Sequence, residues 1–273
     1  MIAALLLAAA AVNVPRIDVA FVLDTTGSMG DEIDVVKNRI VEIARNISAG
    51  RPRPDVRFGI VAYRDRGDAY VTRTFQFSRE IAEVQKTLRS LSAEGGDDEP
   101  EAVAEALHAA VHELQWDFAR STARMAFLIG DAGPQQYRDG KDWRKVSSEA
   151  AEKGITISVI ACSGLSPAGE RVFEKIAKIG DGQMMHLTYT RVARAADGRK
   201  YSVLSEGSKT WVADRELTDS EWKKGGEELA KEGKVKPAAA PPPSTAGMPM
   251  KNNLDAEIAG RVRAKAEELG VNY

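Results

Sequence analysis

A nearly continuous apolar run close to the start of the chain constrains the fold more than any other segment. Residues 17–24 read IDVAFVLD, with apolar side chains at successive positions rather than at every second one. Such a strand must be covered on both faces, as parallel strands between two layers of helices usually are. The run therefore predicts a central strand of an α/β sheet, and it leads directly into the polar turn DTTGS of residues 24–28.

Strand-like and helix-like segments then alternate as far as about residue 190. Apolar residues spaced three and four apart, from Ile33 to Ile47, predict an amphipathic helix that ends at Gly50. Two β-rich runs on either side of Gly67 predict an antiparallel hairpin. Strands are expected at residues 17–24, 56–63, 70–77, 125–131, 155–161 and 183–188. This order of elements predicts a doubly wound, mostly parallel, Rossmann-like sheet with one antiparallel edge strand.

The composition changes after this region and divides the chain into five parts. The parts are an apolar leader at residues 1–15, the α/β domain at 16–190, a small β/α extension at 191–235, a Pro/Ala linker at 236–251 and an amphipathic helix at 252–273. The extension is expected to contain a hairpin over residues 200–213 and a short capped helix after Thr218. The apolar face of the last helix could dock on the parent domain, on a membrane-associated protein or on another copy.

The apolar leader bears on localisation. Residues 1–12 are almost entirely Ala, Leu and Ile, and this run is shorter than the roughly 20 residues that a membrane-spanning helix needs. It is typical of the apolar part of a secretory signal, with Ala8 and Ala10 suited to a cleavage site, although no Lys or Arg precedes it. We expect export to a periplasmic or extracellular space and no integral membrane span. The alternative is a cytoplasmic protein with an apolar tail.

Charge and cysteine content exclude several function classes. The formal net charge is −2, so no broad basic surface is expected for nucleic acid. The single cysteine, Cys162, allows neither an intrachain disulfide nor a cysteine-based zinc site. It lies in an apolar run and is expected to be a small buried side chain.

Three polar clusters are expected at the carboxyl ends of strands in the predicted sheet. They are residues 24–28, the pair Asp97-Asp98, and Asp131. Ligands of doubly wound sheets bind beyond the carboxyl ends of the strands, where the strand order reverses. Carboxylate and hydroxyl oxygens without imidazole or thiolate suit a hard cation such as Mg²⁺. The clusters therefore predict a divalent-metal site at one end of the sheet.

These clusters resemble a known family. Asp24, Thr26 and Ser28 match the D-x-S/T-x-S element of the metal-ion-dependent adhesion site (MIDAS) of von Willebrand factor type A (VWA) domains, which integrin I domains also carry. The segments FGIVAYRD (58–65), GGDDEPEA (95–102) and LIGDA (128–132) resemble further motifs of a bacterial VWA subgroup. The resemblance covers roughly residues 16–190, and four ordered motifs are far more specific than one.

The resemblance implies how a metal would be held. Thr26 and Ser28 would bind it directly, and Asp24 and Asp131 mainly through bound waters. Asp98 stands in the middle loop where many family members have a Thr, with Asp97 beside it. The metal would be Mg²⁺, or Mn²⁺ or Ca²⁺, and it would accept an acidic group of a protein partner.

Each site residue also has a purely structural explanation. Ser28 could cap the first helix, Asp98 could form a capping box with Glu101, and Asp131 could cap a turn.

Two other motifs indicate a functional site less strongly than these clusters do. His108 and His112 are one helical turn apart but lack the Glu of a zinc protease. The tripeptide Arg66-Gly67-Asp68 spells an integrin-recognition motif in a turn where Gly and Asp are expected for backbone reasons.

Three functions remain open at this point. The first is a binding module whose specificity comes from the loops at residues 135–141 and 63–66. The second is a cytosolic adaptor for an ATPase, as similar domains are in chelatase-like assemblies. The third, Mg²⁺-dependent phosphoryl transfer, requires a second Asp where this chain has Thr26, and no P-loop is present. With no nucleophile–base pair in view, we expect no enzymatic activity.

Overall fold

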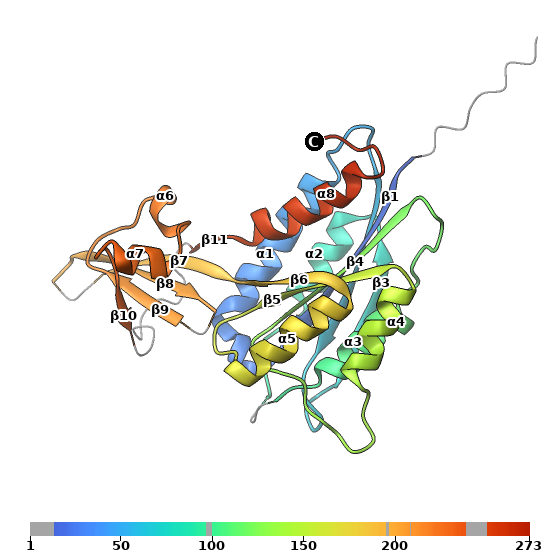
Figure 1. Cartoon of the computed structure of the whole chain (residues 1–273), viewed down its shortest axis with the longest axis horizontal. Coiled ribbons are helices and arrows are strands. Elements are labelled where there is room, and N and C mark those ends of the chain that lie inside the picture. The colour runs from blue at the N-terminus through green and yellow to red at the C-terminus, as the bar shows by residue number, and fades with distance from the viewer. Residues whose placement is uncertain (1–13, 97–99, 195–196, 208, 239–249) are drawn as a thin grey trace, which may run out of the picture.

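The computed structural model describes residues 14–96, 100–194, 197–207, 209–238 and 250–273 (Figure 1). Its larger part is a six-stranded sheet with the strand order β3-β2-β1-β4-β5-β6. Strand β3 pairs with β2 in the antiparallel direction and all other neighbours are parallel. The predicted doubly wound sheet with one antiparallel edge strand is therefore confirmed. The strands are β1 (Arg16–Asp24), β2 (Asp55–Tyr63), β3 (Thr72–Ser78), β4 (Thr122–Gly130), β5 (Ile155–Ala161) and β6 (Asp181–His186).

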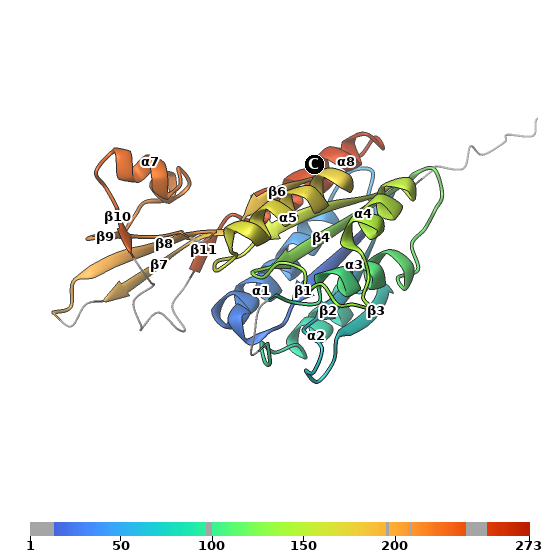
Figure 2. The ribbon, with the colours of Figure 1, turned by 60° about the horizontal axis from the view of Figure 1, so that its bottom comes forward.

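Helices cover both faces of this sheet (Figure 2). One face packs against α1 (Gly30–Ile47), α2 (Ile81–Arg89) and the last helical segment of the chain, formed by η2 (Asp255–Ala259) and α8 (Gly260–Glu267). The other face packs against α3 (Val103–His112), α4 (Trp143–Glu152) and α5 (Pro167–Ile179). The core therefore consists of two apolar layers, one on each side of the sheet.

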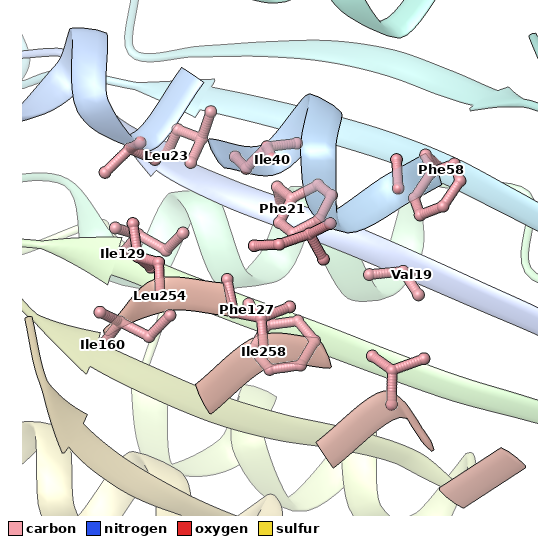
Figure 3. Close-up of a cluster of buried hydrophobic side chains, with 14 of the residues drawn as sticks. Val19, Phe21, Leu23, Ile40, Phe58, Phe127, Ile129, Ile160, Leu254 and Ile258 are labelled. Carbon is pink, nitrogen blue, oxygen red and sulfur yellow. The ribbon is translucent and has the colours of Figure 1, made fainter. Parts of the chain in front are cut away.

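Strand β1 shows why its sequence is apolar throughout. Val19, Phe21 and Leu23 point into the layer under α1, whereas Ala20 and Val22 belong to the opposite layer. Figure 3 shows the first set among side chains of neighbouring strands and of the last helix. The Phe21 ring stacks on the rings of Phe58 and Phe127, with centroid separations of 6.4 and 6.2 Å. Burial on both faces is what the uninterrupted apolar run predicts.

A second, antiparallel sheet follows β6 and is larger than the hairpin expected from the sequence. Its strand order is β10-β9-β8-β7-β11. The strands are β7 (Thr188–Arg194), β8 (Lys200–Glu206), β9 (Lys209–Ala213), β10 (Lys236–Ala238) and β11 (Met250–Asn252). Two short helices, α6 (Asp219–Trp222) and α7 (Gly226–Lys231), pack on it through Trp222 and Leu229. We refer to this unit as the accessory sheet.

The hairpin expected at residues 200–213 accounts only for β8 and β9; the seven-residue strand β7 and two very short strands were not expected. Strands β10 and β11 have only three residues each, and β10 includes Pro237. Such runs carry no readable alternation. Most of the predicted Pro/Ala linker (residues 239–249) lies outside the described residues, as does the predicted leader up to residue 13.

Both ends of the accessory sheet meet at Asn253. The Asn253 amide donates to the Thr188 carbonyl oxygen at 3.0 Å, and the Thr188 amide donates to Asn253 Oδ1 at 2.9 Å. The Asn253 side-chain nitrogen donates to the His186 carbonyl oxygen at 2.9 Å. The chain therefore enters and leaves the accessory sheet at one point.

The last helix docks on its own domain. Leu254, Ile258 and Val262 are fully buried against α1 and the sheet. Arg39 of α1 forms an ion pair with Asp255 at 3.2 Å. Of the three docking partners left open by the sequence, the parent domain is the one found. No helix in the described residues is long and apolar enough to cross a membrane.

Candidate metal centre

Four of the predicted site residues meet at the carboxyl ends of β1 and β4. Asp24 is the last residue of β1, and Asp131 directly follows β4. These strands are neighbours at the centre of the sheet, and the chain leaves them toward opposite edges. This is the point where doubly wound sheets bind ligands. The fold therefore brings together residues that are far apart in the sequence.

Short hydrogen bonds join the four side chains. Asp24 Oδ1 accepts from the Thr26 amide at 2.9 Å and from the Thr26 hydroxyl at 2.6 Å. Thr26 Oγ1 lies 3.1 Å from Ser28 Oγ. The Ser28 hydroxyl donates to Asp131 Oδ1 at 3.1 Å. Asp24, Thr26 and Asp131 are buried, whereas Ser28 is exposed. The result is a compact group of carboxylate and hydroxyl oxygens with one side open to solvent.

The backbone explains why Ser28 is available to this group. Thr26 is extended (φ −73°, ψ 163°), the short 3-10 turn Gly27–Met29 follows, and α1 begins only at Gly30. The N-cap of α1 is Met29, and no side chain caps that helix. The explanation of Ser28 as a helix cap is therefore wrong.

The fifth predicted residue, Asp98, lies outside the described residues together with Asp97. The structural explanation of Asp98, as a residue of a capping box, concerns the start of α3. Helix α3 begins at Val103, and its N-cap is Ala102 without a side-chain hydrogen bond. The described N-cap of α3 is therefore Ala102.

Glu101 is a buried acid beside the site. The sequence suggested only a helix-capping role for it. It is 1% exposed, and its Oε2 has no hydrogen-bond partner among the described residues. Burial, and then the charges of Asp24, Asp65, Asp68 and Asp131, raise the pKa of Glu101 to about 8. Several carboxylates therefore repel one another here, and a bound cation would offset that repulsion.

Tyr63 and Arg64, at the end of β2, are buried next to the DTTGS turn. The Tyr63 side chain is fully buried, and burial together with the charge of Asp24 raises its pKa well above the usual range. Arg64 is also buried, and its guanidinium donates to the carbonyl oxygens of Thr25 and Ser92 at 3.0 and 2.9 Å. The sequence signal for both was their place at the carboxyl end of a predicted strand.

The donor set fits a hard cation. Within the described part of the chain, no group of three or more His, Cys, Asp or Glu side chains is arranged to hold a metal ion. A cation at this edge would therefore depend on the Thr26 and Ser28 hydroxyls as well as on carboxylates. All of these are oxygen donors, which Mg²⁺, Mn²⁺ and Ca²⁺ prefer over zinc or copper.

The other candidate residues have structural contacts. His112 is paired with Glu149 at 2.7 Å on the surface of α3. Cys162 is buried, as expected. In the Arg66-Gly67-Asp68 turn, Arg66 forms an ion pair with Asp139 at 2.6 Å and its guanidinium lies 3.8 Å from the Tyr137 ring centre. The two loops expected to supply specificity therefore contact each other beside the site.

Comparison with known proteins identifies the α/β region. The family model described as von Willebrand factor A domain matches residues 18–204, which is more than half of the chain. Hemicentin-2 of Mus musculus is 26% identical over 204 residues, covering 70% of this chain and 4% of hemicentin-2. Alpha-protein kinase vwkA of Dictyostelium discoideum is 31% identical over 118 residues, covering 42% of this chain and 18% of the kinase. This chain thus spans less than a fifth of either relative.

Among solved structures, similarity to this chain is found at low sequence identity. A structure of proximal thread matrix protein 1 from the mussel byssus, with a zinc-occupied MIDAS motif, has a TM-score of 0.49 and 17% identity. The match covers 63% of this chain and 41% of that protein.

Proposed function

The chain belongs to the von Willebrand factor A domain family, and on that premise we propose that it binds a divalent metal ion and, through it, a protein partner. The proposed ligands are Asp24, Thr26, Ser28 and Asp131, together with Asp98 of the middle loop. The observation that carries the proposal is the set of bonds of 2.6 to 3.1 Å that gathers the first four side chains at the carboxyl ends of two central strands.

The assignment of ligands follows the chemistry of the side chains. The hydroxyls of Thr26 and Ser28 would bind the cation directly, and Asp24 and Asp131 would hold water molecules that complete its shell. Mg²⁺ suits such a shell because it keeps several waters and prefers oxygen donors. When bound, the metal supplies a positive charge at an otherwise acidic surface, which an acidic side chain of a partner can approach.

The charge of the site sets the balance between metal and partner. Asp24 and Asp131 contact the proposed hydroxyl ligands, and Asp98 adds a carboxylate where many family members have a hydroxyl. More negative charge should strengthen binding of the cation and weaken its attraction for an acidic partner group. We therefore expect tight metal binding and comparatively weak adhesion.

The proposed role is binding rather than catalysis. A catalytic site requires a nucleophile with a base, or an acid and a base held at the substrate. Among the described residues around Asp24, the hydroxyls of Thr26 and Ser28 bond to carboxylates and to each other, and no histidine is hydrogen-bonded to them. The kinase name of one relative refers to a protein of which this chain matches 18%.

Calorimetry with Mg²⁺ and with Mn²⁺ tests the metal site. We expect saturable binding to the wild-type chain and its loss in the double variant Ser28→Ala with Asp131→Ala. The matched control is the double variant Asp214→Ala with Ser220→Ala, which alters two exposed residues of the accessory sheet and its helices. It should bind the metal as the wild type does. Unchanged binding in the site variant would rule out this ligand set.

Partner capture tests the second half of the proposal. A pull-down with the wild-type chain in Mg²⁺ should recover a protein that is lost in EDTA and with the double site variant. Recovery that is the same with and without chelator would show that the metal does not mediate the interaction.

Export is a separate proposal. It rests on the apolar composition of residues 1–12, and N-terminal sequencing of the protein purified from cells tests it. A new N-terminus close to Ala11 supports export, whereas an intact Met1 in the cytosol favours the adaptor function.

A further inference from the structure

The Asp68 side chain is turned toward the loop that precedes α3. It lies in the turn between β2 and β3 and is half-buried. Its two carboxylate oxygens accept from the Gly96 amide at 3.2 and 3.1 Å, and Oδ2 also accepts from the Asp65 amide at 3.1 Å. The last residue of the Arg66-Gly67-Asp68 tripeptide is therefore engaged within the domain, which does not fit a recognition motif presented to another protein.

The Gly95-Gly96 segment held by Asp68 lies directly against the DTTGS turn. The Gly95 carbonyl oxygen accepts from the Gly27 amide at 2.8 Å. A Cβ atom on Gly95 would stand 2.1 Å from Asp68 Oδ1, and one on Gly96 would stand 2.7 Å from Thr26 Cβ. Both glycines have positive φ, 75° and 70°. The segment thus fills the space between Asp68 and Thr26 with no room for a side chain.

We propose that Asp68 is a positioning residue of the metal site: its carboxylate holds Gly95-Gly96 against the DTTGS turn and so places the hydroxyls of Thr26 and Ser28. The inference rests on the proposed metal-binding function. The path from Asp68 to the site is short, because Gly96 bonds to Asp68 and Gly95 bonds to Gly27, which lies between the two hydroxyl residues.

Asp68 carries two properties that can be separated. One is its acceptor oxygens, and the other is its negative charge, which contributes to the raised pKa of Glu101. Within the described residues, no Lys or Arg forms an ion pair with Asp68. Asp68→Asn keeps an acceptor oxygen for the Gly96 amide and removes the charge, whereas Asp68→Ala removes both. If placement is the role, the Asn variant should retain function and the Ala variant should lose it.

The ratio of Mg²⁺ to Ca²⁺ affinity reports placement specifically. Mg²⁺ requires nearly ideal octahedral geometry, whereas Ca²⁺ accepts flexible shells at longer distances. Misplaced hydroxyls should therefore weaken Mg²⁺ binding more than Ca²⁺ binding. Loss of a charge alone should weaken both ions to a similar extent, because both are divalent.

The experiment measures both affinities by calorimetry in the full chain. We expect Asp68→Ala to lose about 10- to 100-fold in Mg²⁺ affinity, as substitutions of residues that support metal ligands do, and less in Ca²⁺ affinity. Asp68→Asn should stay within about threefold of the wild type, because a half-exposed charge is screened by salt. Asp214→Ala, which removes an exposed carboxylate paired with Lys236, is the charge-matched control and should leave the ratio unchanged.

A second variant guards against poor folding of Asp68→Ala. Gly95→Ala forces a methyl group onto Asp68 and disturbs the same contact from the other side, so it should lower the Mg²⁺/Ca²⁺ ratio too. An unchanged ratio in Asp68→Ala, or in Gly95→Ala where Asp68→Ala does not fold, overturns the inference, as does an Asn variant as weak as the Ala variant. If the wild-type chain binds neither ion, the proposed function fails instead.

Discussion

The Ser28 hydroxyl donates to Asp131 Oδ1 at 3.1 Å across 103 residues of sequence. Ser28 follows the first strand of the sheet, and Asp131 follows β4, its parallel neighbour. This bond brings oxygen atoms from two loops into one small volume, where the carboxylate of Asp24 also lies. The consequences for binding and for stability can be measured separately.

Asp131→Asn should stabilise the metal-free protein and weaken its binding of metal. The like charges of Asp24 and Asp131 repel each other at this edge; burial first, and then charges that include these two, raise the pKa of Glu101. Replacing one carboxylate by an amide relieves the repulsion but removes a proposed ligand. Thermal unfolding in EDTA and in Mg²⁺ checks both effects, and a variant that gains as much from Mg²⁺ as the wild type would contradict the assignment.

Mg²⁺ should raise the melting temperature of the wild-type chain. A ligand that binds only the folded state at a hundred times its Kd stabilises that state by about 2.7 kcal/mol. For a domain of this size, 1 kcal/mol corresponds to about 2–4 °C, so a shift of roughly 5–11 °C is expected at that concentration. Differential scanning fluorimetry across a Mg²⁺ series provides the measurement, and EDTA should reverse the shift.

Glu32 should make the stability depend on pH. It is buried in α1, where it accepts from the Ser163 amide at 3.3 Å and from the Ser163 hydroxyl. Burial raises its pKa above the ordinary 4.5, although the hydrogen bonds oppose that rise. The folded state therefore holds the proton more tightly than the unfolded state does. The stabilisation is complete below the unfolded pKa and is lost as pH rises through the folded pKa.

Glu32→Gln removes this dependence. The free energy of unfolding of the variant minus that of the wild type should increase as pH rises from the ordinary carboxyl pKa of 4.5 through the raised pKa of the folded state. Urea unfolding at several pH values measures it, with Glu42→Gln, an exposed position of the same helix, as the control. A difference that stays constant over this range would show that Glu32 titrates alike in both states.

Ile258→Ala should destabilise the whole domain. Ile258 is completely buried between the last helix and the sheet, and truncation of such a side chain costs about 2–5 kcal/mol. Glu268→Ala, an exposed position at the end of the same helix, should change the stability by less than about 0.5 kcal/mol. Single cooperative transitions by circular dichroism and by tryptophan fluorescence would show that the helix is part of one folding unit. Loss of the helix alone would argue against it.

Local pattern was enough to predict the mostly parallel sheet and a polar cluster at its carboxyl edge, where Asp24, Thr26, Ser28 and Asp131 lie together. The apolar run of β1 and the helical spacing after it are strong signals, and strand ends place Asp24 and Asp131 at one edge of the sheet. Membership of the family is confirmed by the match over residues 18–204. The ligand set itself remains a prediction until metal binding is measured.

The rest depended on contacts between distant segments. Asp68 could not be recognised as a partner of Gly96, because nothing in a turn sequence tells which loop it faces. Arg64 is charged and yet buried, since backbone carbonyl groups 28 and 39 residues away accept from it. The accessory sheet was underestimated for the same reason: its outer strands owe their conformation to pairing with β7 and β9 rather than to their own residues.

The junction at Asn253 has a consequence for how this chain can be modified. Because the accessory sheet begins and ends at the same place, it is an insertion within the domain rather than an appendage behind it. Replacing residues 189–252 with a short flexible loop should leave a folded domain that retains its last helix. Cutting the chain after His186 should not, because Phe127 and its neighbours would lose the helix that covers them. We therefore expect the accessory sheet to be removable and the final helix to be required for folding.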